Sequence, residues 1–106
     1  MAKYIFLATY SDEATKGIVS GDSDRVAAVK DLCDSLGIRM ISAELTRGEY
    51  DICIIVEADS FAKVAAMNLT FRSRGVVGDK LVTLETVNIE EIRNAAKGAQ
   101  YTPPSG

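Results

Sequence analysis

One segment, residues 48–58, limits most strongly what this chain can fold into. It opens with Gly-Glu-Tyr-Asp, continues with the apolar run Ile-Cys-Ile-Ile-Val and closes with Glu-Ala. A run with apolar residues at both parities is typical of a strand that is buried on both faces of its sheet. A chain of 106 residues forms one domain with one core, and it does not easily cover both faces of a sheet by itself. The segment therefore predicts that a second subunit covers one face.

The complete absence of histidine narrows the possible chemistry. It excludes Ser-His-Asp and Cys-His nucleophile systems, and also zinc or iron sites that depend on imidazole ligands. Cys33 and Cys53 lie far apart in the chain among apolar neighbours, which is typical of buried, reduced thiols. We therefore expect neither a metal nor a cofactor.

The charge pattern bears on partners and location. The net charge is −3 and the basic residues are scattered, whereas a nucleic-acid surface needs a dense basic stripe. No window approaches the ~20 apolar residues of a membrane-spanning helix, and the N-terminus lacks the plan of a signal peptide. We expect no nucleic-acid or membrane partner, and a cytoplasmic location.

Local signals divide the chain into alternating strands and helices. Runs of β-branched and aromatic residues predict strands at 3–10, 38–46, 50–57 and 81–87. Helical spacing and capping residues predict helices from Asp22 or Ser23 to Gly37, from Asp59 or Ser60 to Gly75, and from Asn88 to about residue 96. Residues 11–21 show little periodicity and are predicted to form a loop. We expect a single domain over residues 1–97 and a flexible tail over 98–106.

The order of these elements predicts the fold. A β-α-β-β-α-β chain with right-handed crossovers gives an α+β ferredoxin-like plait, with an antiparallel sheet in the order 4-1-3-2 and both long helices on one face. The first and third strands are central, and we expect them to run parallel. That direction would place Tyr4 beside Tyr50, and Thr9 and Tyr10 near Glu57. The uncovered apolar face predicts that two sheets pack face to face in a dimeric α/β barrel.

Several short motifs are similar to those of a known family. The signature reads Gly48-Glu49-Tyr50-Asp51, and further likeness lies in Lys3-Tyr4, Asp22-Ser23, Arg25, Glu57-Ala58 and Thr83-Leu84. With these motifs the chain resembles the GYD-domain family of small bacterial proteins. The resemblance implies a ferredoxin-like dimeric α/β barrel and no settled biochemical activity. The strand ending Glu85-Thr86-Val87 departs from the basic-aromatic ending that is usual in the family.

Four residues near strand ends are candidates for ligand binding: Tyr10, Tyr50, Asp51 and Glu57. A carboxylate of Asp51 or Glu57 at the mouth of a cavity would bind a cation or act as a general base. In the structural alternative, Asp51 accepts backbone N–H hydrogen bonds and Glu57 ends a strand in solvent. Tyr50 either packs its ring or faces a ligand. The predicted loop at 11–17 is either a connection or a lid, and it lacks the glycine spacing of a phosphate cradle.

These observations leave three functions open. The first is a homo-oligomeric module that binds a small, partly apolar molecule between subunits or acts as a regulator. The second is a cofactor-free enzyme of the monooxygenase or isomerase kind that uses the same fold, with fold analogy as its support. The third is a structural or interaction protein whose sheet face only joins subunits. All three predict a homodimer or a higher homo-oligomer.

Overall fold

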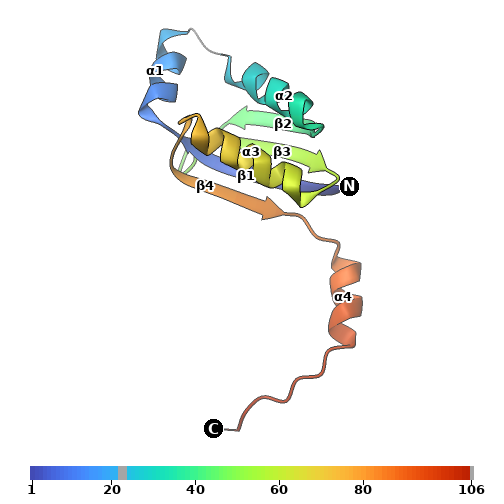
Figure 1. The fold of residues 1–106 in the computed structure, drawn as a ribbon. Helices are drawn as coiled ribbons and strands as arrows, with labels where there is room; N and C mark the ends of the chain where they lie inside the picture. Colours follow the sequence, from blue (N-terminus) through green and yellow to red (C-terminus); the bar gives the residue numbers. More distant parts are fainter. Residues whose placement is uncertain (22–23, 106) are drawn as a thin grey trace.

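The computed structural model describes residues 1–21 and 24–105. Its strands are β1 (Ala2–Tyr10), β2 (Arg39–Leu45), β3 (Ile52–Ala58) and β4 (Val77–Glu85). Its helices are α1 (Asp12–Ser20), α2 (Arg25–Leu36), α3 (Phe61–Ser73) and α4 (Ile89–Lys97). The strands form one sheet in the order β2-β3-β1-β4, with every neighbouring pair antiparallel (Figure 1). This is the predicted α+β plait and the predicted strand order, read from the opposite edge.

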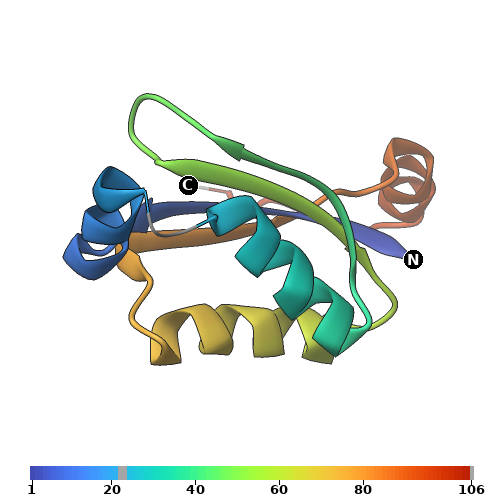
Figure 2. The same cartoon turned by 90° about the horizontal axis from the view of Figure 1, so that it is seen from above.

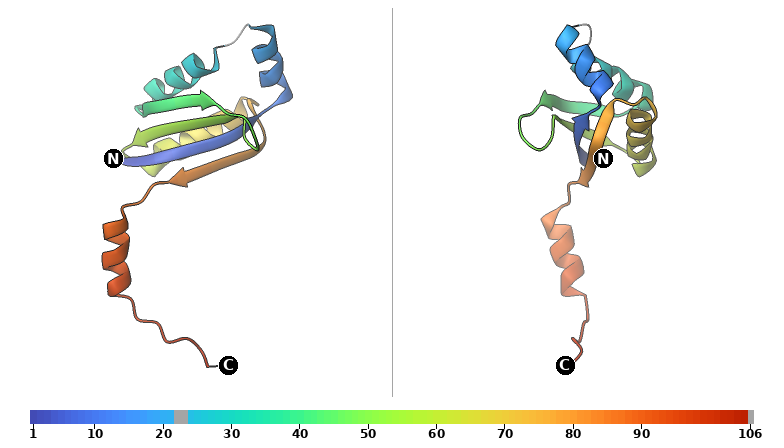
Figure 3. Two further views of the ribbon diagram at one scale, coloured as in Figure 1. Left: turned by 180° about the vertical axis from the view of Figure 1, so that it is seen from behind. Right: turned by 90° about the vertical axis from the view of Figure 1, so that its left-hand side faces the viewer.

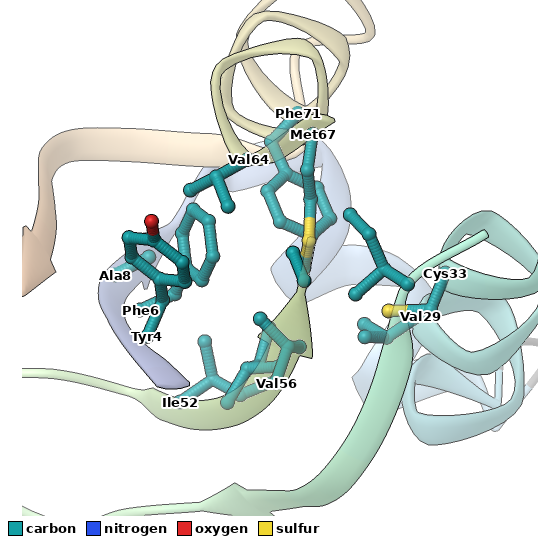
Figure 4. Close-up of a cluster of buried hydrophobic side chains, with 13 residues drawn as sticks. Tyr4, Phe6, Ala8, Val29, Cys33, Ile52, Val56, Val64, Met67 and Phe71 are labelled. Atoms are coloured by element: carbon teal, nitrogen blue, oxygen red, sulfur yellow. The ribbon is translucent and has the colours of Figure 1, made fainter. Parts of the chain in front are cut away.

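The core lies between one face of the sheet and helices α2 and α3 (Figure 2). Alternate residues of the two central strands enter it and are almost completely buried: Tyr4, Phe6, Ala8, Ile52, Ile54, Val56 and Ala58. The helices meet them with Val29, Cys33, Val64, Met67 and Phe71 (Figure 4). The rings of Phe6 and Phe71 pack edge to face with centroids 6.2 Å apart. In both β1 and β3 the even-numbered residues therefore face the helices.

The opposite side of the sheet, which we call the open face, is apolar at its centre. It consists of Ile5, Leu7, Cys53, Ile55, Val82 and Leu84, which are neighbours across the strand pairs. No helix of the described chain covers these residues, as the end-on view in Figure 3 shows. Leu84 is 47% exposed, and the other five are only partly buried. A doubly apolar central strand with cover on one side agrees with the sequence pattern.

The central strands run antiparallel, so the predicted parallel pairing is wrong. Ala2 lies opposite Ala58, and Ala8 lies opposite Ile52. The crossover through α2 returns the chain so that β2 runs parallel to β1. The hairpin after β2 then reverses β3, which is therefore antiparallel to both.

This reversal separates the residues that parallel strands would have brought together. Glu57 lies opposite Lys3, at the end of β1 remote from Thr9 and Tyr10. Tyr50 lies at the Tyr10 end of the sheet and not beside Tyr4. The two predicted groupings, Tyr4 with Tyr50 and Thr9-Tyr10 with Glu57, are therefore both wrong.

The segment predicted as a loop at 11–21 contains a helix, α1. Ser11 caps it by accepting a hydrogen bond from Ala14 N at 3.1 Å, and Asp12 and Glu13 place acidic charge in its first turn. Ala14 is the one buried residue of α1. A helix that buries one residue needs no repeating apolar spacing, so the sequence shows no helical period here. The capping serine and the acidic first turn were the available signals of a helix. The prediction of a loop at 11–17 is therefore wrong, and a role of this segment as a lid stays a prediction.

The remaining boundaries differ in detail. Asp22 and Ser23, the predicted caps of α2, lie outside the described residues, and Asp24 caps α2 by accepting from Ala27 N at 3.0 Å. Ser60 and Asn88 cap α3 and α4 as predicted.

Strand β4 begins at Val77, four residues before the predicted start at Leu81. Between these two residues β4 bulges away from β1, which contributes only Thr9 there. Gly78 fits this bulge because a Cβ at its position would lie 2.9 Å from the carbonyl oxygen of Tyr10. Gly78 thus lies inside a strand, three residues before its predicted start.

Helix α4 and the residues after it extend from the body of the domain (Figure 1). The radius of gyration is 17.5 Å, whereas a compact chain of this length has about 13 Å. No residue of α4 is buried. Residues 98–105 after α4 contain no helix or strand. None of the described helices is long and apolar enough to cross a membrane.

Candidate functional site

The hairpin between β2 and β3 meets the end of β1, and we call this region the hairpin end: residues 46–51 with residues 9–10 and 79–80. Thr46 closes the hairpin, since its N–H donates to Asp51 O at 2.8 Å and its hydroxyl donates to Tyr50 O at 2.5 Å. Gly48 has φ +132°, a conformation that side-chain-bearing residues rarely adopt. The signature glycine therefore serves the turn.

Asp51 fastens the hairpin to β1 with two hydrogen bonds. Its N–H donates to Ala8 O at 2.9 Å, and its carboxylate oxygen Oδ2 accepts from Tyr10 N at 2.8 Å. The regular pairing between β1 and β3 ends at Ala8 and Ile52, so Asp51 lies one residue outside the paired part of β3. The Asp51 side chain thus takes the place of a main-chain carbonyl and extends the ladder. This geometry supports the structural alternative for the signature aspartate.

Tyr10 lies on the helix side of the sheet. Its ring packs against the core, and the guanidinium carbon of Arg25 lies 5.9 Å from the ring centroid. Arg25 also donates to Ala14 O at 3.2 Å, which joins α1, α2 and β1 at this corner. The Tyr10 hydroxyl is buried and has no hydrogen-bond partner among residues 1–21 and 24–105. Burial raises the pKa of Tyr10 above its ordinary value, and Arg25 lowers it in part while the Asp51 charge raises it.

A polar cluster covers the other side of the hairpin end. Lys80 Nζ pairs with Glu49 Oε1 at 3.0 Å and lies 5.9 Å from the ring centroid of Tyr50. The main chain of Lys80 also donates to Thr9 Oγ1 at 3.2 Å, and that hydroxyl lies 3.3 Å from Asp79 Oδ1. The hydrogen bond to Glu49 raises the pKa of Lys80. The hairpin therefore reaches past β1 and contacts β4.

Glu57 lies at the far end of β3, away from the hairpin end. Its carboxylate pairs with the Arg39 guanidinium, and Lys3 faces it across the ladder. Together with Glu85 and residues of α4 it lines an open hollow of about 660 Å³ beside the N-terminus. The hollow has mixed charged and apolar walls and is wide open to solvent.

The structure thus divides the four predicted candidates. Tyr10, Tyr50 and Asp51 share the hairpin end, with Tyr10 on the helix side and Tyr50 beside Lys80. Glu57 lies at the opposite end of the sheet, apart from the other three candidates. Ligand binding by these residues stays a prediction.

Sequence reasoning missed Lys80, Asp79 and Arg25 as neighbours of the signature. Asp79 and Lys80 precede residue 81, the predicted start of the fourth strand, whereas the structure places both inside β4. The Arg25 contact depends on how α1 and α2 fold over β1, and it has no local signal.

The described residues offer little chemistry beyond these contacts. They contain no cluster of three or more acidic or cysteine ligands that could hold a metal ion. Cys33 is completely buried, and burial raises the pKa of its thiol. Cys53 lies on the open face. Both carboxylates among the candidates, Asp51 and Glu57, have structural partners.

Comparison with known proteins agrees with this architecture. A protein called FFRP-DM1 has a crystal structure that covers 82% of this chain and 100% of its own, with a TM-score of 0.55 at 15% identity. A hypothetical protein from Pyrococcus horikoshii, PHS023, gives the same TM-score and identity over 83% of this chain and 92% of its own. At this identity the likeness shows the fold alone.

Sequence comparison is more specific. A curated protein from Thermus thermophilus, the glutamine synthetase and cystathionine beta-lyase binding protein, is 31% identical over 93 residues, which are 87% of this chain and 95% of the relative. The family model of the GYD domain matches residues 4–96. The match spans the signature, all of the sheet except the first two residues of β1, and nearly all of α4, so the chain belongs to the GYD domain family.

Proposed function

We propose that this protein is a homo-oligomeric binding or regulatory module in which two copies pack their open faces together. The observation that carries the proposal is the apolar centre of the open face, where Ile5, Leu7 and Ile55 meet with no cover from the described part of their chain. Apolar patches that remain contiguous on one face of a protein usually mark an interaction site. Two such faces would form the barrel that the family resemblance implies.

The exposed surface supports association. The chain exposes 7272 Å², whereas a compact monomer of 11.4 kDa exposes about 5,800 Å². The excess of roughly 1,500 Å² exceeds the ~800 Å² that one partner buries in an interface of standard size. Helix α4 and residues 98–105 are exposed and contribute to this excess, and the open face presents a continuous apolar surface for association.

Binding fits the candidate residues better than catalysis does. Asp51 is hydrogen-bonded to Tyr10 N, and Glu57 is paired with Arg39. A general base needs a carboxylate that is free to take a proton from a substrate, and both of these hold the sheet instead.

The relative from Thermus thermophilus indicates the kind of partner, since its name describes a protein that binds two enzymes. We therefore propose that the assembled module binds an enzyme of this kind and regulates it. A small effector between the two sheets would meet Tyr50 at one end of the open face and Glu57 at the other, with Asp51 and Tyr10 behind Tyr50.

Binding is tested with glutamine synthetase and cystathionine beta-lyase from the organism that carries this chain, immobilised separately for biolayer interferometry. We expect the wild-type protein to bind at least one of them at micromolar concentration. Native mass spectrometry of the same sample reports the number of subunits and any retained small molecule. A protein that binds neither enzyme and retains no ligand would contradict the proposed function.

A further inference from the structure

Helix α4 is amphipathic, with one apolar side of the kind that packs against another protein surface. Around its axis, Ile89, Ile92 and Ala96 fall on one side, while Glu90 and Asn94 fall on the opposite side. Ile89 is 61% exposed and Ile92 is 45% exposed. An isolated helix of nine residues is marginal in water, because isolated helices shorter than ~12–15 residues rarely persist. The helix therefore needs a partner surface, and the described residues of its own chain bury none of its side chains.

The exit of α4 from the sheet is fixed. Thr86 donates to Lys3 O twice, from its N–H at 2.9 Å and from its hydroxyl at 3.2 Å. Asn88 is the N-cap and accepts from Glu90 N at 2.8 Å and from Glu91 N at 3.2 Å. Val87 alone lies between the anchor and the cap. The short junction between Thr86 and Asn88 therefore leaves little freedom for α4 to turn back and pack on the sheet of its own chain.

The direction of the exit suggests what meets α4. Figures 2 and 3 place it beyond the end of β4 and away from the layer of α2 and α3. Between α4 and the start of β1 the open hollow of about 660 Å³ remains, with Ile92 and Ala95 in one wall. A second copy seated on the open face would reach this hollow and the apolar side of α4.

We propose that α4 is an arm that packs its apolar side against a second copy of this chain and clasps the dimer. This inference rests on the proposed function, because it needs the open-face dimer. It adds that the arm of each copy completes the interface of the other, so that the C-terminal helix controls how tightly the module assembles.

The test compares two variants of the full chain that add the same charge to opposite sides of α4. Ile92→Glu places a carboxylate in the proposed contact, and Asn94→Glu places one on the polar side as the matched control. Sedimentation equilibrium gives the dissociation constant of the dimer for each. Loss of a buried isoleucine contact should raise that constant at least about tenfold for Ile92→Glu and less than about threefold for Asn94→Glu.

Hydrogen–deuterium exchange over 89–97 provides the second measurement. We expect these amides to be protected in concentrated wild-type protein and to lose protection on dilution toward the dissociation constant. If the protein is a dimer but both variants keep its dissociation constant, the arm is overturned and the proposed function stands. Protection that is independent of concentration would place α4 on its own chain and also overturn the arm. A wild-type monomer would overturn both proposals.

Discussion

Removing the Asp51 side chain tests why the signature contains an aspartate. In Asp51→Ala the carboxylate that accepts from Tyr10 N at 2.8 Å is lost, and a part-buried N–H is left unpaired. A hydrogen bond to a charged group contributes ~1.5–3 kcal/mol, so we expect the free energy of unfolding to fall by about 2 kcal/mol. For a domain of this size that loss lowers the melting temperature by roughly 8–16 °C.

Asp51→Asn is the sharper variant because its amide oxygen still accepts from Tyr10 N. It removes only the charge-assisted part, and we expect a loss of about 1 kcal/mol. Circular dichroism during heating measures both changes, at one fixed protomer concentration since association adds to stability. Asp79→Asn is the matched control, because its partner contact with the Thr9 hydroxyl is long and exposed. An Asn variant that melts at or above the parent temperature would refute this reasoning and make Asp51 a functional acid.

Three further predictions follow from single residues. Gly48→Val should lower the free energy of unfolding by about 1 kcal/mol or more, because φ +132° strains any side chain, and an unchanged urea midpoint would argue against the turn. The raised pKa of Tyr10 means that its stabilising contribution is intact below pH ~10 and is lost as pH rises through the folded pKa. Alkaline unfolding should therefore be less steep in Tyr10→Phe, and an identical pH profile would contradict the burial of this hydroxyl. In undenatured protein a thiol reagent should spare Cys33, which is 0% exposed, and should label Cys53 faster as dilution dissociates the dimer. Labelling of Cys53 that does not depend on concentration would count against its place in the interface.

The order of strands and the long helices could be predicted because each has a strong local period. Residues 52–56 are apolar at both parities, and α2 and α3 are bounded by caps and glycines. The main error was the relative direction of β1 and β3, which were predicted to run parallel. The antiparallel relation of β1 and β3 follows from the hairpin at Gly48, which the sequence announced, but it has to be traced through the whole topology and not read from either strand.

The site was harder to predict than the fold. Asp51 could be singled out from the signature. The sequence also suggested that its carboxylate accepts a backbone N–H hydrogen bond, but it did not show which residue donates that bond. Tyr10 N becomes that partner only because β1 runs two residues beyond its regular pairing with β3, from Ala8 to Tyr10. Lys80 joins Tyr50 through a bulge in β4, and tertiary contacts of this sort leave no local pattern.

The central claim is that the open face joins two copies of the chain, and paired substitutions on neighbouring positions of the sheet test it. Ile55 lies on the open face, while Phe6 faces the helices and is 1% exposed. Size-exclusion chromatography with light scattering should find a dimer or a larger assembly for the wild type at low micromolar concentration, and a folded monomer for Ile55→Asp. Phe6→Asp should fail to fold, because it buries an unpaired charge in the core. A folded wild-type monomer, or an Ile55→Asp protein that assembles as the wild type does, would contradict the account.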